Sequence, residues 1–472
     1  MPFAIPASRQ QSRPASGKSM LRNPAPTSTT TWKPPLPSPR QPQDWMKAPT
    51  AETGSSPSGN VLMPARSSPK QQLAPHQQPC PLWLQRRLQA AGGAVPFSTY
   101  MEWVLQDPQH GYYGHGRVAF GRKGDFVTAA SLGPTLATLL LPQVLQCLDA
   151  LAGTSEALSL VEWGPGDGGL SRDLGILLAQ ARPQWRQRLQ LVLVEASPAL
   201  RQRQTQQLQR QPLTWRHVHP AELAAAPVTG LLLANELLDA LPVERLTRGE
   251  DGWRWQWVHC RQGRLGWCPG PPLPAEIPAL LAAVGIHLAG DAFPLGWSSE
   301  LALAQRPWCR AAAAALQRGW LWCLDYGHNA RRYYSPQRPD GTLMAYAQQQ
   351  AVGNPFLQPG RMDLTAHVCT DLLRYWAEGA GWTWCGEVSQ GQGLLALGLA
   401  RQLSRLGEAD GPPLAQRLAQ REALLRLVDP AGLGGFRWLF FHRGCPTPVP
   451  GNLLALKESP GREDGDYTCF AG

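Results

Sequence analysis

Three glycines at alternate positions, Gly164, Gly166 and Gly168, follow an apolar segment in the stretch VEWGPGDGGLSRDLG at residues 161–175. Glycine adopts positive φ readily and, having no side chain, lets a ligand approach the backbone closely. A fourth glycine, Gly169, comes next and precedes a helix-like segment. The pattern predicts a strand, a ligand-binding loop and a helix. It leaves open whether the ligand is a dinucleotide, a phosphate or a cofactor without phosphate.

Acidic residues around this loop favour a cationic ligand. Asp167 lies within the loop, and Glu162 lies just inside the preceding apolar segment. Such carboxylates repel a pyrophosphate at the helix N-terminus, whereas they attract the ammonium and sulfonium of S-adenosylmethionine (SAM). Glu195 ends the next apolar segment, where it can accept hydrogen bonds from both ribose hydroxyls. It comes 27 residues after Gly168, against about 20 in the dinucleotide fingerprint. We therefore predict SAM rather than NAD.

A third apolar segment ends in ANELLDALP, which contains Asn235, Glu236 and Asp239. At this edge of the predicted sheet the carboxylates face the place where a methyl group would leave a sulfonium. A helix N-cap region would also favour acidic residues, so that alternative stays open. Arginine is always protonated, and its methylation requires a carboxylate that orients the guanidinium and accepts a proton. These residues predict a carboxylate clamp on a basic nucleophile.

The elements that must position these residues alternate between strand and helix. Continuous apolar runs at 158–164, 189–196 and 230–236 are typical of strands buried on both faces of a parallel sheet, with helical stretches between them. The sequence thus predicts an α/β fold with a mostly parallel sheet. Further predicted elements are helices at about 97–105 and 299–317, a helix within 362–381, strands at 319–327 and 434–444, and a hairpin of 252–260 with RLGWC added to the same sheet.

Composition separates the N-terminal part of the 472-residue chain from the rest. Residues 1–79 contain sixteen prolines and carry most of the net charge of +10, with nine Lys or Arg against two Asp or Glu. We predict a disordered leader here, with a targeting segment or a mis-assigned start as alternatives. We expect one SAM-binding domain over residues 80–445, with an inserted antiparallel and helical region at about 245–318. A C-terminal tail covers 446–472.

Several classes of function find little support in the composition. Residues after 79 are nearly neutral and have no dense Lys or Arg run, so we expect no nucleic-acid partner. The ten cysteines include no CxxC pair, and we expect buried free thiols rather than a metal site or disulfides. The apolar run LATLLLPQVLQCLDALAG is interrupted by polar residues and a proline, so we expect no transmembrane segment.

Taken together, the motifs resemble those of the MidA-like methyltransferases, whose mitochondrial branch is the arginine methyltransferase that assists assembly of respiratory complex I. The resemblance covers most of 97–444 and rests on eight segments: YMEWVLQDPQHGYYG, GDFVTAASLG, VEWGPGDGG, ANELLDALPVERL, LDYGH, GTLMAY, PGRMDLTAHV and GLGGFRWLFFHRG. It implies a class I, Rossmann-like SAM-dependent methyltransferase fold with an N-terminal helical segment and an added region. It also implies protein arginine N-methylation.

The resemblance assigns roles to further residues. Gly124, Asp125 and Phe126 match the GDF turn near the amino-acid end of SAM. Ser131 stands near the position of a glutamate in many family members, which removes one substrate-facing carboxylate. His328 and His367 also lie in family motifs, and we expect hydrogen-bonded structural roles for both.

The implied partner is a protein with a reactive arginine, such as a subunit of an NAD(P)H dehydrogenase complex. The sequence leaves the oligomeric state open, with a homodimer as one alternative. The expected location is the bacterial cytoplasm, or the mitochondrion if the chain is eukaryotic. Two other hypotheses remain at this stage: an assembly protein that keeps the SAM fold without turnover, and a nicotinamide-dependent oxidoreductase.

The composition of the leader leads to a first prediction. Because apolar periodicity begins only after residue 80, removal of residues 1–79 should leave the thermal midpoint and SAM affinity almost unchanged. Calorimetry on the full chain and the truncated chain measures both quantities. A large loss of either in the truncated chain would show that the leader packs on the domain.

Overall fold

The computed structural model describes residues 79–116, 118, 134–153, 155, 157–347, 350–408, 413–445 and 453–456. All of them belong to the unit that spans Gln72–Gly472. The GDF turn at Gly124–Phe126, Ser131, the leader apart from residue 79, and most of the predicted tail lie outside the described residues. The predictions made for these segments therefore remain predictions.

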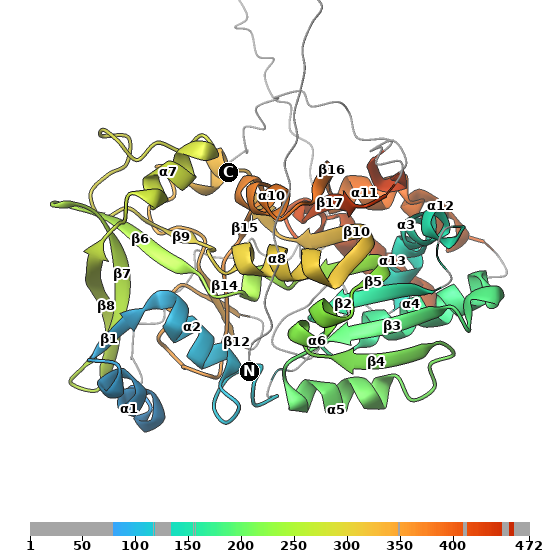
Figure 1. Cartoon of the computed structure of the whole chain (residues 1–472), viewed down its shortest axis with the longest axis horizontal. Coiled ribbons are helices and arrows are strands. Elements are labelled where there is room, and N and C mark those ends of the chain that lie inside the picture. Colours follow the sequence, from blue (N-terminus) through green and yellow to red (C-terminus); the bar gives the residue numbers. More distant parts are fainter. Residues whose placement is uncertain are drawn as a thin grey trace, which may run out of the picture. The chain divides into compact units, whose positions relative to one another are not determined.

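A seven-stranded sheet with the order β16-β17-β10-β5-β2-β3-β4 occupies the right-hand side of Figure 1. Strands β4, β3, β2, β5 and β10 run parallel, whereas β17 is antiparallel to β10 and β16 is antiparallel to β17. The predicted mostly parallel sheet of a class I fold is confirmed. The strands are β2 (Leu158–Trp163), β3 (Leu189–Val194), β4 (Thr214–Val218), β5 (Val228–Asn235), β10 (Leu316–Asp325), β16 (Thr383–Ser389) and β17 (Arg437–Arg443).

The central strands are buried on both faces because helices cover the sheet from both sides. Neighbouring residues on one strand enter different cores: Leu160 packs in one and Val161 in the other. The helices of the first core are α3 (Pro134–Ala152), α4 (Gly169–Ala181), α11 (Gln390–Ala396), α12 (Leu399–Arg405) and α13 (Leu414–Val428). The opposite face carries α5 (Pro198–Gln207), α6 (Pro220–Ala225), α8 (Gln305–Ala315) and α10 (Thr370–Gly379). This two-sided cover explains the continuous apolar runs in the sequence.

Helix α3 is the one described helix that is long and apolar enough to cross a membrane by composition. It contains Pro142, and nine of its residues are buried against the sheet and neighbouring helices. Its polar Gln143 is fully buried and accepts the backbone N–H of Ala455 at 3.0 Å. The apolar surface of α3 is therefore part of a protein core.

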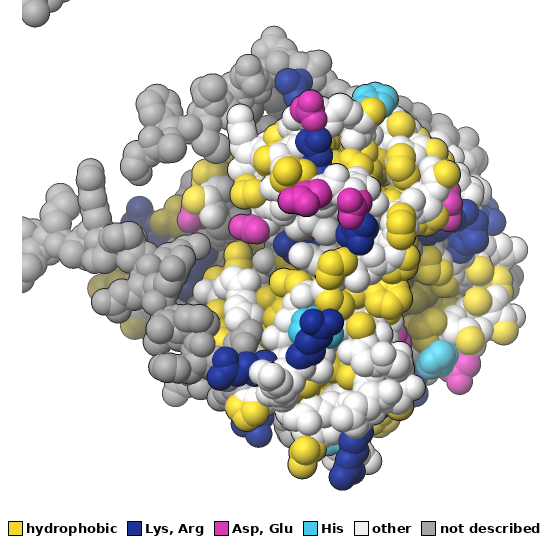
Figure 2. All heavy atoms as spheres, turned by 90° about the vertical axis from the view of Figure 1, so that its left-hand side faces the viewer, with side chains coloured by type: hydrophobic (Ala, Val, Ile, Leu, Met, Phe, Trp, Pro, Cys, Tyr) yellow, Lys and Arg dark blue, Asp and Glu magenta, His cyan; other side chains and the backbone are white. Residues whose placement is uncertain are grey.

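The predicted hairpin exists, but its placement in the central sheet is wrong. It belongs to a second, antiparallel sheet in which β1, β7, β6 and β9 are successive neighbours and β8 pairs with β7 (Figure 1). The edge of the central sheet beyond β10 is already occupied by β17 and β16, so the hairpin pairs with other strands. The second sheet and its helices comprise β1 (Ala94–Pro96), β6 (Glu244–Gly249), β7 (Gly252–Arg261), β8 (Arg264–Pro272), β9 (Ser298–Leu301), α1 (Leu82–Ala90), α2 (Phe97–Gln106) and α7 (Glu276–Ala283). Its outer side shows apolar side chains among charged ones of both signs (Figure 2).

The helix predicted at about 299–317 begins later than the sequence indicated. Residues 298–301 form β9, which pairs with β6, and the helix starts at Gln305. Pairing with a distant strand prevails there over local helix propensity. The helix predicted within 362–381 is present from Thr370 and is preceded by β14 (Asp363–Thr365), which pairs with β12 and was not predicted. The remaining elements are β11 (Gly327–His328), α9 (Ala330–Tyr333), β12 (Met344–Ala347), β13 (Gln350–Val352), β14 (Asp363–Thr365), β15 (Val368–Cys369), η2 (Pro183–Trp185), η3 (Leu238–Ala240), η4 (Leu433–Gly435) and η6 (Leu454–Leu456).

Cysteines serve as packing residues in the described part of the chain. Nine of them are described, all with free thiols, and six of these are buried. Burial raises the pKa of Cys309 to about 12 and that of Cys323 well above its usual value. These thiols stay protonated, as the sequence-based interpretation expects of small buried apolar residues.

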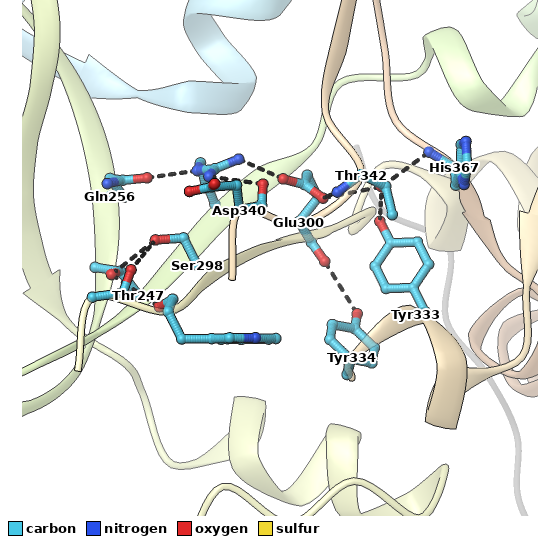
Figure 3. A network of polar contacts seen from close by, with 12 residues as sticks. Thr247, Gln256, Ser298, Glu300, Tyr333, Tyr334, Asp340, Thr342 and His367 are labelled. Atoms are coloured by element: carbon cyan, nitrogen blue, oxygen red, sulfur yellow. Dashed lines mark hydrogen bonds and ion pairs between the residues drawn. The ribbon is translucent and has the colours of Figure 1, made fainter. Parts of the chain in front are cut away.

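A buried polar network joins the second sheet to residues 333–367 (Figure 3). Arg245 on β6 and Glu300 on β9 form an ion pair at 2.5 Å, and both side chains are almost completely buried. The other oxygen of Glu300 accepts the N–H and the hydroxyl of Thr342 at 2.7 and 3.0 Å. Thr342 Oγ1 accepts the N–H of His367 at 3.1 Å. The network therefore fixes the segment that leads to β14 against the second sheet.

The backbones of β2, β5 and β10 approach closely at Gly230 and Gly319, which leads to a prediction. A Cβ on Gly230 would overlap the carbonyl oxygen of Ser159 on β2, a backbone atom that cannot move aside. We expect Gly230→Ala to lower the free energy of unfolding by about 3 kcal/mol, measured by chemical denaturation. Gly379→Ala is the matched control, because no heavy atom lies within 4 Å of its new Cβ. Equal stability of the two variants would contradict this account of the sheet.

Candidate functional site

The glycine loop after β2 has the backbone conformation that the sequence predicts. Gly164, Gly166 and Gly168 have φ of +71°, +56° and +83°, in the left-handed region that residues with a Cβ rarely adopt. Gly168 immediately precedes α4. A chain of left-handed residues at the start of a helix directs backbone N–H groups towards a ligand, so this loop can hold a cofactor.

Glu162 and Asp167 lie beside the loop, and both make contacts that order it. Glu162 is buried at the end of β2 and accepts the hydroxyl of Ser171 on α4. Burial raises the pKa of Glu162 to about 7, and the nearby charge of Asp167 adds to the effect. Asp167 Oδ1 accepts the N–H of Gly169 at 2.9 Å, which satisfies a free donor at the start of α4. Asp167 thus has a local structural role that the sequence-based interpretation omitted.

Glu195 lies at the end of β3, the strand beside β2, as predicted. Its Oε1 accepts the N–H of Ser197 at 2.7 Å, and its Oε2 accepts Gln204 Nε2 at 3.3 Å. The same Gln204 nitrogen donates to the carbonyl of Gly166 at 2.8 Å. Gln204 therefore couples the glycine loop to Glu195. No sequence pattern distinguishes Gln204, because α5 contains several glutamines in a polar stretch.

The end of β5 brings Asn235, Glu236 and Asp239 together with the end of β10. Glu236 has φ +50°, which is unusual for a residue with a side chain, and its N–H donates to the carbonyl of Leu324 at 2.8 Å. Backbone conformations of this kind cluster at functional sites. Asn235 and Asp239 are 7% and 6% exposed. The Oδ1 atom of each has no hydrogen-bond partner among the described residues.

Two residues at the end of β10, Asp325 and Tyr326, complete this region and were not predicted. Asp325 accepts the N–H groups of Leu238, Asp239 and Tyr326 at 2.8, 3.3 and 2.9 Å. Burial, with the charges of Asp239 and Glu236, raises the pKa of Asp325 well above its usual value. The motif LDYGH follows a buried strand, so the reasoning applied to the ends of β2, β3 and β5 would also have found Asp325.

Tyr326 and Asp239 form a pair in which one oxygen of the carboxylate is already held. The Tyr326 hydroxyl donates to Asp239 Oδ2. Burial raises the pKa of Asp239 to about 6, although the hydrogen bond from Tyr326 opposes this shift. The remaining oxygen, Oδ1, is available for a cation or a proton. The site therefore contains a carboxylate that changes its protonation state close to neutral pH.

The two histidines singled out from the sequence lie beside this pair. The rings of His328 and His367 are 4.9 Å apart, and the ring of His367 contacts that of Tyr326. Burial and nearby arginines lower the pKa of His328 to about 3 and that of His367 to about 4, so both rings are neutral at pH 7. Nδ1 of His367 has no hydrogen-bond partner among the described residues. The predicted structural roles of the two histidines stay predictions.

Comparison with known proteins identifies the family. Residues 139–388 match the model of a family described as S-adenosyl-L-methionine-dependent methyltransferase. A Burkholderia thailandensis protein crystallised with S-adenosyl-homocysteine is 32% identical, with a TM-score of 0.68 over 78% of this chain and 92% of its own. A relative from Drosophila melanogaster, named "Protein arginine methyltransferase NDUFAF7 homolog, mitochondrial", is 27% identical over 75% of this chain and 82% of its own. The Homo sapiens relative, "Protein arginine methyltransferase NDUFAF7, mitochondrial", is 27% identical over 74% of this chain and 80% of its own.

The chain belongs to this family of SAM-dependent methyltransferases. The resemblance drawn from the motifs, the predicted enzyme class and the choice of SAM over a dinucleotide are confirmed. The roles of individual residues are not tested by the family match. They follow below as predictions and proposals.

The position of Glu195 leads to a prediction about cofactor affinity. Glu195→Ala removes a charge-assisted hydrogen bond, worth roughly 1.5–3 kcal/mol, and should weaken SAM binding by about ten- to a hundredfold. Titration calorimetry measures the affinity. Glu250→Ala, at an exposed turn of the second sheet, is the control and should bind SAM like the wild type. Wild-type affinity in Glu195→Ala would exclude Glu195 from the cofactor site.

Proposed function

We propose that this chain transfers a methyl group from SAM to an arginine of a protein, with Asp239 as the acceptor-side base. One observation supports this most directly: Asp239 is buried, its Oδ2 is held by Tyr326, and its Oδ1 has no described partner. Such a carboxylate can orient a guanidinium and accept its proton. Asn235 and Glu236 precede it at the same strand end and complete the acceptor side.

The residues on the cofactor side fit SAM. The left-handed loop of Gly164, Gly166 and Gly168 offers backbone groups to the cofactor, and Glu195 lies at the end of the adjacent strand, where it can hold the ribose. Asp167 places negative charge within the loop, which suits a cationic cofactor rather than a pyrophosphate. Glu162, whose pKa is raised to about 7, adds negative charge there when it is ionised. When bound, SAM supplies an electrophilic methyl group on a positively charged sulfur.

The proposed transfer balances with residues of this chain as the proton acceptor. A guanidinium nitrogen forms a bond to the methyl carbon while the carbon–sulfur bond breaks, and the electrons of that bond remain on sulfur. The nitrogen gives up one proton to Asp239 Oδ1, and the product remains a cation because methylated guanidinium is still strongly basic. Tyr326 and Asp325 hold Asp239 in place during the step, through its carboxylate and its backbone N–H.

The choice of arginine and of the partner draws on the relatives. Their names describe protein arginine methyltransferases of mitochondria. We carry the substrate class to this chain, and we propose a subunit of a complex I-like NAD(P)H dehydrogenase as the methylated partner. Comparison of arginine methylation across the proteome, in cells with and without this chain, tests both. A loss of methylation at a dehydrogenase subunit is expected, and an unchanged arginine methylome would refute the proposal.

The acceptor-side role of Asp239 predicts a separation of binding from transfer. Asp239→Asn keeps the shape of the side chain and removes the base, so single-turnover methyl transfer to the partner should fall by about 10²–10⁴-fold. SAM affinity, measured on the same sample, should change little. Asp251→Asn, with an 89% exposed carboxylate in the β6–β7 turn, serves as the control. Transfer at the wild-type rate in Asp239→Asn would remove Asp239 from the mechanism.

The raised pKa of Asp239 predicts the pH dependence of the same step. A base must be ionised to accept a proton, and burial raises the pKa of Asp239 to about 6. The single-turnover rate should therefore fall as pH is lowered through about 6 and level off above about 7. Asp239→Asn should lose this acid limb while keeping a low residual rate. An unchanged acid limb in the variant would assign it to another group.

A further inference from the structure

A second carboxylate approaches the acceptor side from a different part of the chain. Asp363 lies on β14, directly opposite Tyr346 on β12, so the two side chains point to the same face of this antiparallel pair. Asp363 is 3% exposed, whereas Tyr346 is half-buried. Both residues lie in motifs that the sequence shows, GTLMAY and PGRMDLTAHV, but only the pairing of β12 with β14 brings them together.

Tyr113 connects Asp363 to the cofactor side. Burial, together with the charge of Asp363, raises the pKa of the Tyr113 side chain well above its usual value. The carbonyl of Tyr113 accepts the hydroxyl of Ser197, whose N–H donates to Glu195. Tyr113 lies in the turn after α2, so the N-terminal segment contributes an aromatic residue that contacts the cofactor side. The ring is half-buried.

Asp363 and Asp239 lie close enough to act on the same groups. The N–H of Ala366, which follows β14, donates to the carbonyl of Asp239 at 3.0 Å. Burial raises the pKa of Tyr113 and of Tyr346, and the charges of Asp363 and Asp239 raise both further. β14, which carries Asp363, packs against η3, which carries Asp239, so the two buried carboxylates lie near the same two tyrosines, and Tyr326 is bound to Asp239 as a third.

The two buried carboxylates and the tyrosines beside them favour a planar cation as the ligand. Two carboxylates in a low-dielectric place repel each other unless a positive charge lies between them. The unpartnered Oδ1 atoms of Asp239 and Asn235, both more than nine-tenths buried, are acceptors for its N–H groups. A guanidinium has five donors on the edges of a plane and stacks on aromatic rings, so it can engage two carboxylates and the tyrosines together. An ammonium has three donors on a single nitrogen, so it matches two separated carboxylates and flat rings less well than a planar guanidinium does.

We propose that Asp363, with Tyr346 opposite it, forms the second wall of the acceptor site and makes the site select a guanidinium over an ammonium. This inference rests on the proposed function, because it places the acceptor at Asp239. Asp363 is a specificity-determining residue in this account, and Asp239 alone accepts the proton. Loss of Asp363 should therefore reduce the preference for arginine over lysine rather than the fold or the cofactor affinity.

The test measures this preference by binding, without relying on turnover. The full chain is saturated with S-adenosylhomocysteine and titrated with N-acetyl-arginine amide and N-acetyl-lysine amide by NMR. The wild type should bind the arginine compound at least about tenfold more tightly, and Asp363→Asn should reduce this ratio to about two or less. Asp340→Asn, an exposed aspartate before Thr342, should keep the wild-type ratio. A merely structural defect would weaken both compounds together and leave the ratio unchanged.

A second variant, Tyr346→Ala, and a separate assay of methyl transfer complete the test. If Asp363→Asn loses its thermal transition, Tyr346→Ala replaces it, because that variant removes the stacking ring and should also lower the ratio. A wild-type ratio near one, or a variant that keeps the wild-type ratio, would overturn the inference. Methyl transfer to protein arginine, assayed on the same wild-type sample, reports on the proposed function separately. Selective arginine binding without transfer would leave this inference standing and refute the proposed function.

Discussion

The carboxylate of Asp325 is the constraint on which the acceptor side depends. It lies buried at the end of β10 and accepts three backbone N–H groups, two of them from the turn that follows β5. A buried carboxylate without such bonds would cost several kcal/mol, so the turn and the strand end stabilise each other. This fixes the backbone that carries Glu236, in its left-handed conformation, and Asp239. The position of the Asp239 backbone therefore follows from the hydrogen bonds that the Asp325 carboxylate accepts from this turn, and Tyr326 then holds the Asp239 side chain.

The second sheet extends this constraint to the wall that faces Asp239. Its buried pair, Arg245 and Glu300, holds Thr342, and Thr342 holds the N–H of His367 (Figure 3). Ala366, which immediately precedes His367, donates its backbone N–H to the carbonyl of Asp239. A buried ion pair adds little net stability, but it fixes geometry because removing one partner leaves an uncompensated charge. The second sheet thus holds, through this network, the segment that leads to β14 beside the turn of Asp239.

Much of the fold could be predicted because it follows from local patterns. Continuous apolar runs identified the central strands, and the glycines at 164, 166 and 168 have the positive φ that their spacing indicated. The register of distant pairing could not be predicted, which is why β9 was taken for the start of a helix and β14 was missed. Of the site residues, Glu195 and Asp239 lie where the ends of apolar runs placed them. Gln204 contacts a segment far away in the sequence, and no local pattern marks it. Asp363 lies in a motif that the sequence does show, but its nearness to Asp239 depends on the pairing of β14.

The charge balance of the proposed reaction explains why a carboxylate with a raised pKa suits this position. Before transfer, the ionised Asp239 faces two positive groups, the guanidinium and the sulfonium. After transfer the guanidinium is still a cation, but the positive charge on sulfur is gone. The proton that reaches Asp239 removes one negative charge at the same time, so the net charge of the site does not change. In a low-dielectric site an unbalanced charge would be costly. Burial raises the pKa of Asp239 to about 6. A general base works best when its pKa lies near the working pH, so this shift makes Asp239 a better proton acceptor than an exposed aspartate.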